Sequence, residues 1–249
     1  MIEFKKRRMK RMFIDIIPSA KDIIESKLIH KNAVVIDVLR ATSVIVTALY
    51  HGAKAIIPVR EVGEAFSIYQ KGSTDEYRLS GERKGLPIPG FHFGNSPLEY
   101  TKKAVENKTL ILTTTNGTQG IKGAEKSDTL YIGSFLNGKA VANQLLEEEK
   151  DVVLVCAGTN GIFSLEDGLC AGKIISSLNQ LTSIKTTDFG VALQALYEGH
   201  KNSLLPFIQQ GAHCRYLIEQ GFQSDILYCI QEDLYDRIPV YKNNKIILP

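Results

Sequence analysis

The sequence predicts an α/β protein in which helices flank a layered, largely parallel β-sheet. Short apolar runs rich in valine and isoleucine alternate along the chain with longer amphipathic stretches, which is the order of βα units. The runs are continuous rather than alternating, as expected for strands buried on both faces of a parallel sheet. The 249 residues are enough to bury a sizeable core without disulfides or metals.

Strands and helices alternate over the first three quarters of the chain. We predict strands at 13–17, 33–38, 55–58, 109–113, 129–132 and 152–156. We predict helices between and after them at 19–28, 42–51, 61–71, 117–124, 137–149 and 164–180. Residues 187–235 are expected to be mostly helical, with breaks near Pro206, Gly211 and Gly221. Two strand-like segments, 238–241 and 245–248, follow and are joined by the turn residues Asn243 and Asn244.

Residues 81–97 are expected to form a long ordered loop. Four glycines and three prolines in these seventeen residues argue against a regular element. Its aromatic residues argue against disorder, and a loop of this length inside a compact α/β chain is usually functional. We therefore predict that it lies over the site.

Two of the predicted βα units resemble each other. Aligning 34–45 with 110–121 matches Thr42 with Thr118 and Arg40 with Asn116, so each unit has a strand, a short polar loop and a threonine opening a helix. The alignment predicts an internal duplication, with similar subdomains at about 12–105 and 106–249. Since any two βα units share these features, two unrelated units would explain them equally well.

The charge distribution argues against a nucleic-acid partner for the folded part. The formal net charge is +3, yet residues 1–11 hold six Lys and Arg residues and one Glu, which leaves the rest slightly acidic. We expect residues 1–11 to be a disordered basic tail; the alternatives are an arm that binds an anionic partner, or translation that begins at Met12. No apolar run is long enough to span a membrane, and no pair of cysteines has CxxC spacing. A cytoplasmic protein with reduced thiols is the expectation.

The first strand-to-helix junction carries Asp37, Arg40, Thr42 and Ser43. Ligands of open α/β folds bind at the carboxyl ends of the strands, and a helix N-terminus favours an anion. Arg40 would add a bidentate contact to that anion, and Asp37 could hold a divalent cation. The alternative is structural: Thr42 caps the helix and Asp37 pairs with Arg40.

Two further junctions offer polar side chains of the same kind. The second is rich in hydroxyls that could cradle oxyanions, and its residues include Thr114, Thr115, Asn116, Gly117 and Thr118. The third contains Ser164, Glu166 and Asp167. Its carboxylates could join Asp37 on a metal ion, or the three residues could form a capping box in the first turn of a helix. In the long loop, Arg83, Asn95 and Ser96 could reach the same ligand.

Several familiar sites are disfavoured because their sequence motifs are missing. The chain has no GxxxxGK[ST] phosphate loop, no GxGxxG after a strand and no GxSxG elbow. The five histidines show neither HxH nor HExxH spacing, so a zinc site is not indicated.

Four segments carry a resemblance to a known family. They are VIDVLRATSVI (35–45), GERKGLPIPGFHFGNSPLE (81–99), TTTNGT (113–118) and CAG…SLEDGLCAG (156–172). In this order they resemble the 2-phosphosulfolactate phosphatase family, from about residue 12 to residue 249. The resemblance implies an α/β phosphatase domain that uses Mg²⁺ to release phosphate from 2-phosphosulfolactate. The other product would be sulfolactate, on the route to coenzyme M.

Roles for individual residues are our own inference from these patterns. We predict Asp37, Arg40, Glu166 and Asp167 as the catalytic set, with Mg²⁺ held by Asp37 and by Glu166 or Asp167. The predicted substrate-binding residues are Thr42, Ser43, Arg83, Asn95, Ser96, Thr114, Thr115, Asn116, Gly117, Thr118 and Ser164. Direct attack by water and attack by Asp37 to form an aspartyl phosphate are both open at this point.

The predicted partner is a small anionic phosphate ester, with no nucleic acid and no membrane. Two other functions fit the same residues: a phosphatase for other 2-phospho-hydroxy acids, such as phospholactate or phosphoglycolate, and a non-catalytic anion-binding protein. The sequence leaves a homodimer open.

Overall fold

The computed structural model describes residues 11–72 and 75–249. The prediction of a basic tail at 1–11 lies outside the described residues, apart from Arg11. The strands are β1 (Phe13–Ile17), β2 (Asn32–Ile36), β3 (Ala55–Pro58), β4 (Tyr77–Arg83), β5 (Leu86–Pro87), β6 (Thr109–Thr113), β7 (Thr129–Gly133), β8 (Val152–Cys156), β9 (Lys185–Thr186), β10 (Val240–Lys242) and β11 (Lys245–Ile247).

The helices fill the connections between these strands. The α-helices are α1 (Ala41–Tyr50), α2 (Val62–Lys71), α3 (Lys102–Val105), α4 (Gly117–Gly123), α5 (Gly138–Glu148), α6 (Leu165–Leu181), α7 (Asp188–His200), α8 (Leu204–Ile208), α9 (Ala212–Glu219) and α10 (Gln223–Cys229). Short 3₁₀ helices are η1 (Ala20–Asp22), η2 (Glu25–Lys27), η3 (Pro97–Glu99), η4 (Phe135–Asn137) and η5 (Lys201–Ser203). In the described part of the chain, no helix is long and apolar enough to cross a membrane.

The strands form one mixed sheet that is parallel on both sides of a central hairpin. Its order is β5-β4-β6-β3-β11-β10-β7-β2-β8-β1-β9. Strands β4, β6 and β3 are mutually parallel, and so are β7, β2, β8, β1 and β9. The C-terminal hairpin β10–β11 pairs antiparallel with β7 on one side and with β3 on the other. The predicted α/β class with a largely parallel sheet is therefore confirmed.

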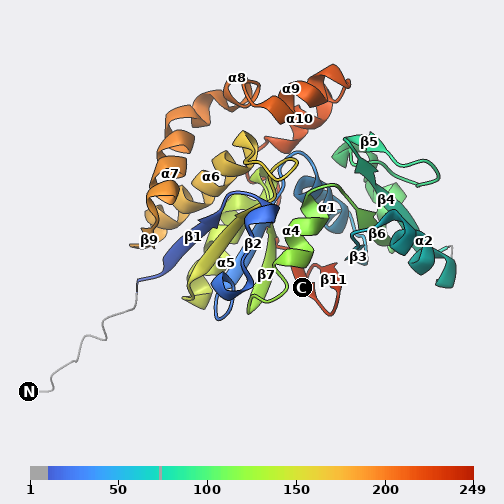
Figure 1. The fold of residues 1–249 in the computed structure, drawn as a ribbon, viewed down its shortest axis with the longest axis horizontal. Coiled ribbons are helices and arrows are strands. Elements are labelled where there is room, and N and C mark those ends of the chain that lie inside the picture. Colours follow the sequence, from blue (N-terminus) through green and yellow to red (C-terminus); the bar gives the residue numbers. More distant parts are fainter. Residues whose placement is uncertain (1–10, 73–74) are drawn as a thin grey trace, which may run out of the picture.

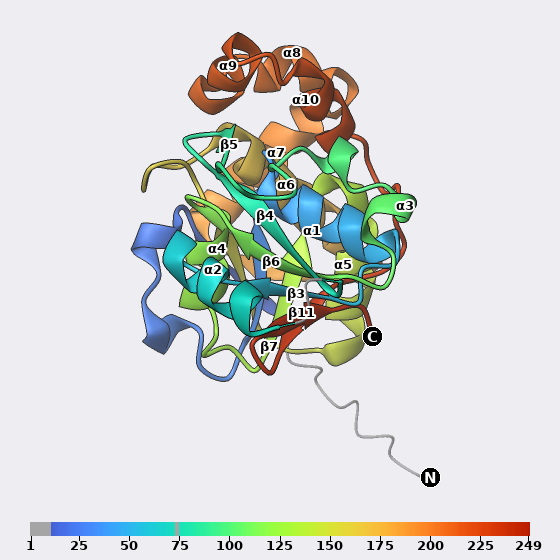
Figure 2. The same cartoon turned by 90° about the vertical axis from the view of Figure 1, so that its right-hand side faces the viewer.

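Helices α1 and α4 lie between the two parallel halves of the sheet (Figures 1 and 2). Along β2, Val34 and Ile36 face a core shared with α5, α6 and α7, whereas Ala33 and Val35 face the core around α1 and α4. The second core also contains Leu110 of β6, from the other half of the sheet. The N-termini of α1 and α4 are thereby brought together, and the polar junctions that precede them meet.

The two ranges 12–105 and 106–249 interleave in this sheet. Strand β6 of the second range lies between β3 and β4, and β2 of the first range lies between β7 and β8. A threonine closes the loop after each of these central strands. Thr42 bonds to the backbone of Asp37, five positions earlier, and Thr118 bonds to the backbone of Thr114, four positions earlier. The internal duplication and the two subdomains stay predictions.

Two local predictions were wrong. The helix expected at 19–28 is replaced by η1 and η2, because Ile23 and Ile24 between them adopt the extended backbone that β-branched residues favour. The loop expected from residue 81 begins inside β4 and forms a short hairpin with β5. This position of the strand requires glycine, because its φ is +136° and a Cβ would lie 1.9 Å from the carbonyl oxygen of Thr113.

The C-terminal helices α8, α9 and α10 gather at one end of the molecule, beside the β4–β5 hairpin (Figure 2). Leu204, Ile208, Cys214 and Leu217 are buried in the core that α6 and α7 share. The hydroxyl of Tyr216 in α9 crosses to donate a hydrogen bond to the hairpin. This helical segment therefore closes over the ends of the strands.

Candidate active site

A cavity of about 460 Å³ lies where the strand ends, the hairpin and the C-terminal helices meet. It is lined by Asp37, Leu39, Arg40, Glu82, Lys84, Gly85, Asn95, Thr115, Asn116, Thr159, Asn160, Ala212, His213, Tyr216 and Leu217. All three polar junctions predicted from the sequence contribute to it or border it. The volume is at the small end of the range for small-molecule pockets in proteins.

Asp37 lies at the end of β2 with only 8% of its surface exposed. Its carboxylate accepts a hydrogen bond from the backbone N–H of Ala41 at 3.2 Å, while Thr42 fixes its backbone. Burial raises the pKa of Asp37 well above its ordinary value, and the neighbouring carboxylates Asp167 and Glu82 raise it further. A cation or a proton would stabilise this group of acids.

Asp167 ties the ends of two neighbouring strands together. One of its oxygens accepts from the N–H of Val38 at 2.8 Å, and the other from the N–H of Gly158 at 3.0 Å. The hydroxyl of Ser43 in turn donates to the carbonyl of Val38 at 2.8 Å. Asp167 and Ser43 are both buried and neither lines the cavity, so the contacts they make here shape the junction.

Two buried polar atoms near the cavity have no hydrogen-bond partner among the described residues. Glu166 is 1% exposed and its Oε2 is one of them; the Oδ1 of Asn95, which lines the cavity, is the other. Burial raises the pKa of Glu166 to about 7, and the charge of Asp37 also raises it. Ser164 shares a 2.8 Å hydrogen bond with the hydroxyl of Thr159 and makes no capping bond to the helix, so the capping box is absent.

The second junction packs directly against the first. Thr114 and Thr118 are buried and bond to each other's backbone, so their hydroxyls hold the loop rather than face the cavity. A Cβ on Gly117 would lie 2.5 Å from the side chain of Ala41 and 2.6 Å from the Oδ2 of Asp37. A glycine at this position is therefore what allows α4 to approach Asp37.

Thr115 and Asn116 form one wall of the cavity. The N–H of Thr115 donates to Glu82 at 2.7 Å, and its hydroxyl donates to the same carboxylate at 3.2 Å. The Oδ1 of Asn116 accepts from the N–H of Asn160 at 3.1 Å. These contacts connect the ends of β4, β6 and β8 around the cavity.

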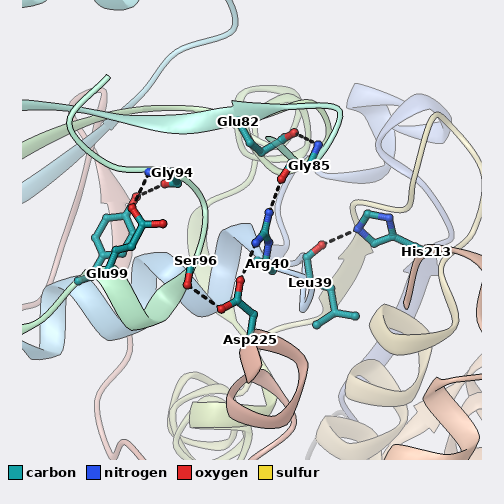
Figure 3. A network of polar contacts seen from close by, with 10 residues as sticks. Leu39, Arg40, Glu82, Gly85, Gly94, Ser96, Glu99, His213 and Asp225 are labelled. Atoms are coloured by element: carbon teal, nitrogen blue, oxygen red, sulfur yellow. Dashed lines mark hydrogen bonds and ion pairs between the residues drawn. The ribbon is translucent and has the colours of Figure 1, made fainter. Parts of the chain in front are cut away.

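Arg40 is committed to partners within the protein (Figure 3). It is 2% exposed, pairs with Asp225 of α10 at 2.6 Å and donates to the carbonyl of Gly85 at 2.6 Å. Its guanidinium also stacks 4.0 Å from the ring centre of Phe222. Ser96 donates to the second oxygen of Asp225 at 2.6 Å. The alternative ion pair of Arg40 with Asp37 is not formed, and nothing in the sequence pointed to Asp225.

Arg83 faces away from the cavity. Its guanidinium donates to the carbonyl oxygens of Glu82 and Arg60 and to the hydroxyl of Thr113, at 2.8 to 2.9 Å. It is not among the residues that line the cavity, whereas the next residue, Lys84, is. A substrate contact by Arg83 would require it to leave these three acceptors.

Ten of the fifteen residues that line the cavity were absent from the predicted set, and Glu82, Lys84 and His213 are among them. Glu82 and Lys84 lie within a motif that the sequence did single out, but their side-chain directions follow from the hairpin. His213 comes from α9, which carries no motif, and its Nε2 contacts the carbonyl of Leu39 at 2.8 Å. Burial and the charge of Arg40 lower the pKa of His213, so the imidazole is neutral at neutral pH.

A divalent cation fits this set of residues in one way. In the described ranges, no three His, Cys, Asp or Glu side chains converge as ready metal ligands. Mg²⁺ usually takes one or two carboxylates and completes its shell with water and substrate oxygens. Asp37 and Glu166 suit that role because Asp37 lines the cavity and the Oε2 of the buried Glu166 has no hydrogen-bond partner among the described residues. The oxygens of Asp167 already accept two backbone N–H groups.

The fold and the cavity define an α/β protein with a small, charged ligand site at its strand ends. A family model described as 2-phosphosulpholactate phosphatase matches residues 18–244. A protein of Clostridium acetobutylicum named a probable 2-phosphosulfolactate phosphatase is 45% identical over 237 residues, which cover 95% of this chain and 100% of its own. Proteins of the same name from Clostridium perfringens (46% identical; 94% and 96% covered) and Caldanaerobacter subterraneus (43%; 93% and 96%) are also similar. The chain belongs to the 2-phosphosulpholactate phosphatase family.

Proposed function

We propose that this protein is a Mg²⁺-dependent phosphatase that hydrolyses 2-phosphosulfolactate to sulfolactate and phosphate. Membership of the family supports the phosphatase activity and the substrate. The observation that carries the proposal is that the buried carboxylate of Asp37 lies in the cavity wall, where the polar junctions at the starts of α1 and α4 meet. Carboxylates with raised pKa values beside backbone N–H groups are suited to phosphoryl transfer.

The charged groups of the cavity favour a small anionic ligand that binds together with a cation. Asp37 and Glu82 line it, as do Arg40, Lys84 and the amide side chains of Asn95, Asn116 and Asn160. A three-carbon phosphate ester that also carries a carboxylate and a sulfonate would repel the carboxylates if it entered alone. Mg²⁺ held by Asp37 and Glu166 would offset this repulsion and stabilise charge on the phosphoryl oxygens.

The residues of this chain leave two routes for the reaction. In one, a carboxylate accepts a proton from water, whose oxygen forms the new bond to phosphorus. In the other, an oxygen of Asp37 attacks phosphorus, and water then hydrolyses the aspartyl phosphate. In both, the phosphorus–oxygen ester bond breaks and the ester oxygen, once protonated, becomes the hydroxyl of sulfolactate. Acid-quenched enzyme carrying radiolabelled phosphate on Asp37 would support the second route, and its absence during turnover the first.

The supporting roles follow from the contacts already described. Asp167 holds the ends of β2 and β8 through two backbone N–H groups, and Glu82 holds Thr115 in the opposite wall. Arg40 fixes the hairpin and α10 relative to the first junction through its contacts to Gly85 and Asp225. We propose that these residues position the cavity walls.

The four cysteines are free and buried, which fits the reducing cytoplasm that we propose for the reaction, on the route to coenzyme M.

A substrate panel tests the proposal. Phosphate release is measured with 2-phosphosulfolactate, 2-phospholactate and phosphoglycolate, each with Mg²⁺ and with EDTA. The expected result is turnover that EDTA abolishes and Mg²⁺ restores, with the highest kcat/KM for 2-phosphosulfolactate. A higher kcat/KM for another substrate would give the protein a different specificity, and binding without turnover would make it an anion-binding protein.

A further inference from the structure

The cationic side chains near the cavity are not equally available to a ligand. Arg40 is paired with Asp225 and donates to Gly85, and Arg83 turns to three acceptors outside the cavity. His213 is neutral at neutral pH because burial lowers its pKa. Lys84 lines the cavity, is exposed, and has no ion pair with any residue in the described ranges.

Lys84 stands on a rigid turn. The paired residues Arg83 and Leu86 leave a two-residue connection, Lys84–Gly85, between β4 and β5. Both residues have positive φ, +52° and +76°, as in the type I′ turns that fit the twist of a hairpin. Because the backbone of this turn is rigid, the position of the Lys84 ammonium group changes only with the rotamers of its own side chain.

The backbone of this turn is held from three sides. The N–H of Gly85 donates to Glu82 at 2.6 Å, and its carbonyl accepts from Arg40 at 2.6 Å, as Figure 3 shows. The carbonyl of Lys84 accepts from the hydroxyl of Tyr216 at 2.8 Å. Residues from three parts of the chain thus fix the backbone around one exposed lysine that lines the cavity.

We infer that Lys84 binds the acid group that the substrate carries besides its phosphate ester. This inference rests on the proposed function and names the residue that recognises the substrate class. The buried end of the cavity, with Asp37 and the N-terminus of α1, is suited to the phosphoryl group. The remaining carboxylate or sulfonate then lies one or two bonds further out, where the flexible lysine can reach it.

Lysine suits this task because its ammonium is a mobile point charge that needs no fixed geometry from its ligand. A sulfonate or a carboxylate would each satisfy it. A hydrogen bond to a charged group contributes enough that removing the charge is expected to lower kcat/KM by about 10- to 100-fold.

The test compares Lys84→Met with wild type on three esters that share one carbon skeleton. They are 2-phosphosulfolactate, 2-phospholactate and isopropyl phosphate, which has neither acid group. Lys84→Arg keeps the charge, and Lys126→Met makes the same charge change at an exposed position before β7, at the end of that strand remote from the cavity. Titration calorimetry with sulfolactate and with inorganic phosphate gives a second readout that needs no turnover.

The inference predicts a selective loss. Lys84→Met should lose about 10- to 100-fold in kcat/KM on 2-phosphosulfolactate and bind sulfolactate more weakly, with phosphate binding and isopropyl phosphate hydrolysis unchanged. Lys84→Arg should restore most of the loss, and Lys126→Met should match wild type. A loss shared with 2-phospholactate assigns the contact to the carboxylate, and a loss confined to 2-phosphosulfolactate assigns it to the sulfonate.

Equal losses on all three esters, or unchanged sulfolactate binding, would overturn the inference. A wild-type protein without phosphatase activity would refute the proposed function instead. In that case the calorimetric comparison of sulfolactate with phosphate still tests Lys84 by itself.

Discussion

The pairing of Arg40 with Asp225 should dominate the stability of the region that encloses the cavity. Asp225→Ala removes an ion pair and a hydrogen bond, each 2.6 Å long, and leaves the guanidinium of Arg40 without its carboxylate at 2% exposure. Removing one partner of a buried pair usually costs about 3–5 kcal/mol, because the other charge stays buried and uncompensated. We expect a loss in this range in the free energy of unfolding.

Urea denaturation followed by circular dichroism measures this loss. Asp128→Ala, which breaks a more exposed pair with Lys150, is the control and should leave the denaturation midpoint close to that of wild type. Asp225→Asn keeps the size and part of the hydrogen bonding, and should fall between wild type and Asp225→Ala. Removing an exposed ion pair costs less than about 1 kcal/mol. If Asp225→Ala lowers the free energy of unfolding by no more than that, Arg40 and Asp225 do not form a buried ion pair and the reasoning fails.

Two further predictions concern the buried end of the cavity. The carboxyl of Glu166 binds its proton more tightly in the folded protein, where its pKa is about 7, than in the unfolded chain, where its pKa is near the ordinary value of 4.5. The free energy of unfolding therefore falls as the pH rises from the lower pKa to the higher one. In metal-free protein, the stability of wild type relative to Glu166→Gln should therefore fall by about 3 kcal/mol between pH 4.5 and pH 7, and a pH-independent difference in urea denaturation would contradict this. Gly117→Ala should lower the free energy of unfolding by about 1–3 kcal/mol and reduce phosphate release, because the new Cβ would collide with Ala41 and Asp37. Gly199→Ala, in the last turn of α7 where an added Cβ would meet no atom within 4 Å, should instead raise the free energy of unfolding by about 0.5–1 kcal/mol. Equal melting temperatures for the two variants would refute the close approach at Gly117.

The fold was predictable because the parallel strands are buried on both faces. Such strands are continuous apolar runs, and β1, β3, β6 and β8 have the bounds expected from the sequence. Strand β4 was missed because Gly81 and the polar residues after it look like a loop. Only the approach of Thr113 explains why a glycine with positive φ continues a strand.

The site was predictable where polar residues follow a strand directly. Asp37, Thr115 and Asn116 line the cavity as that rule suggests. The rule does not give the direction of a side chain, so it could not separate Arg83 from Lys84 across a turn. Nor could it find Asp225, which meets Arg40 from 185 positions away through the packing of α10.

Phosphate release from 2-phosphosulfolactate by wild type and Asp37→Asn, each with Mg²⁺ and with EDTA, tests the central claim most directly. The account predicts Mg²⁺-dependent turnover by wild type, none with EDTA, and a loss of about a hundredfold or more in kcat for Asp37→Asn. A variant that keeps more than about a tenth of the wild-type kcat would show that the reaction does not take place at this cavity.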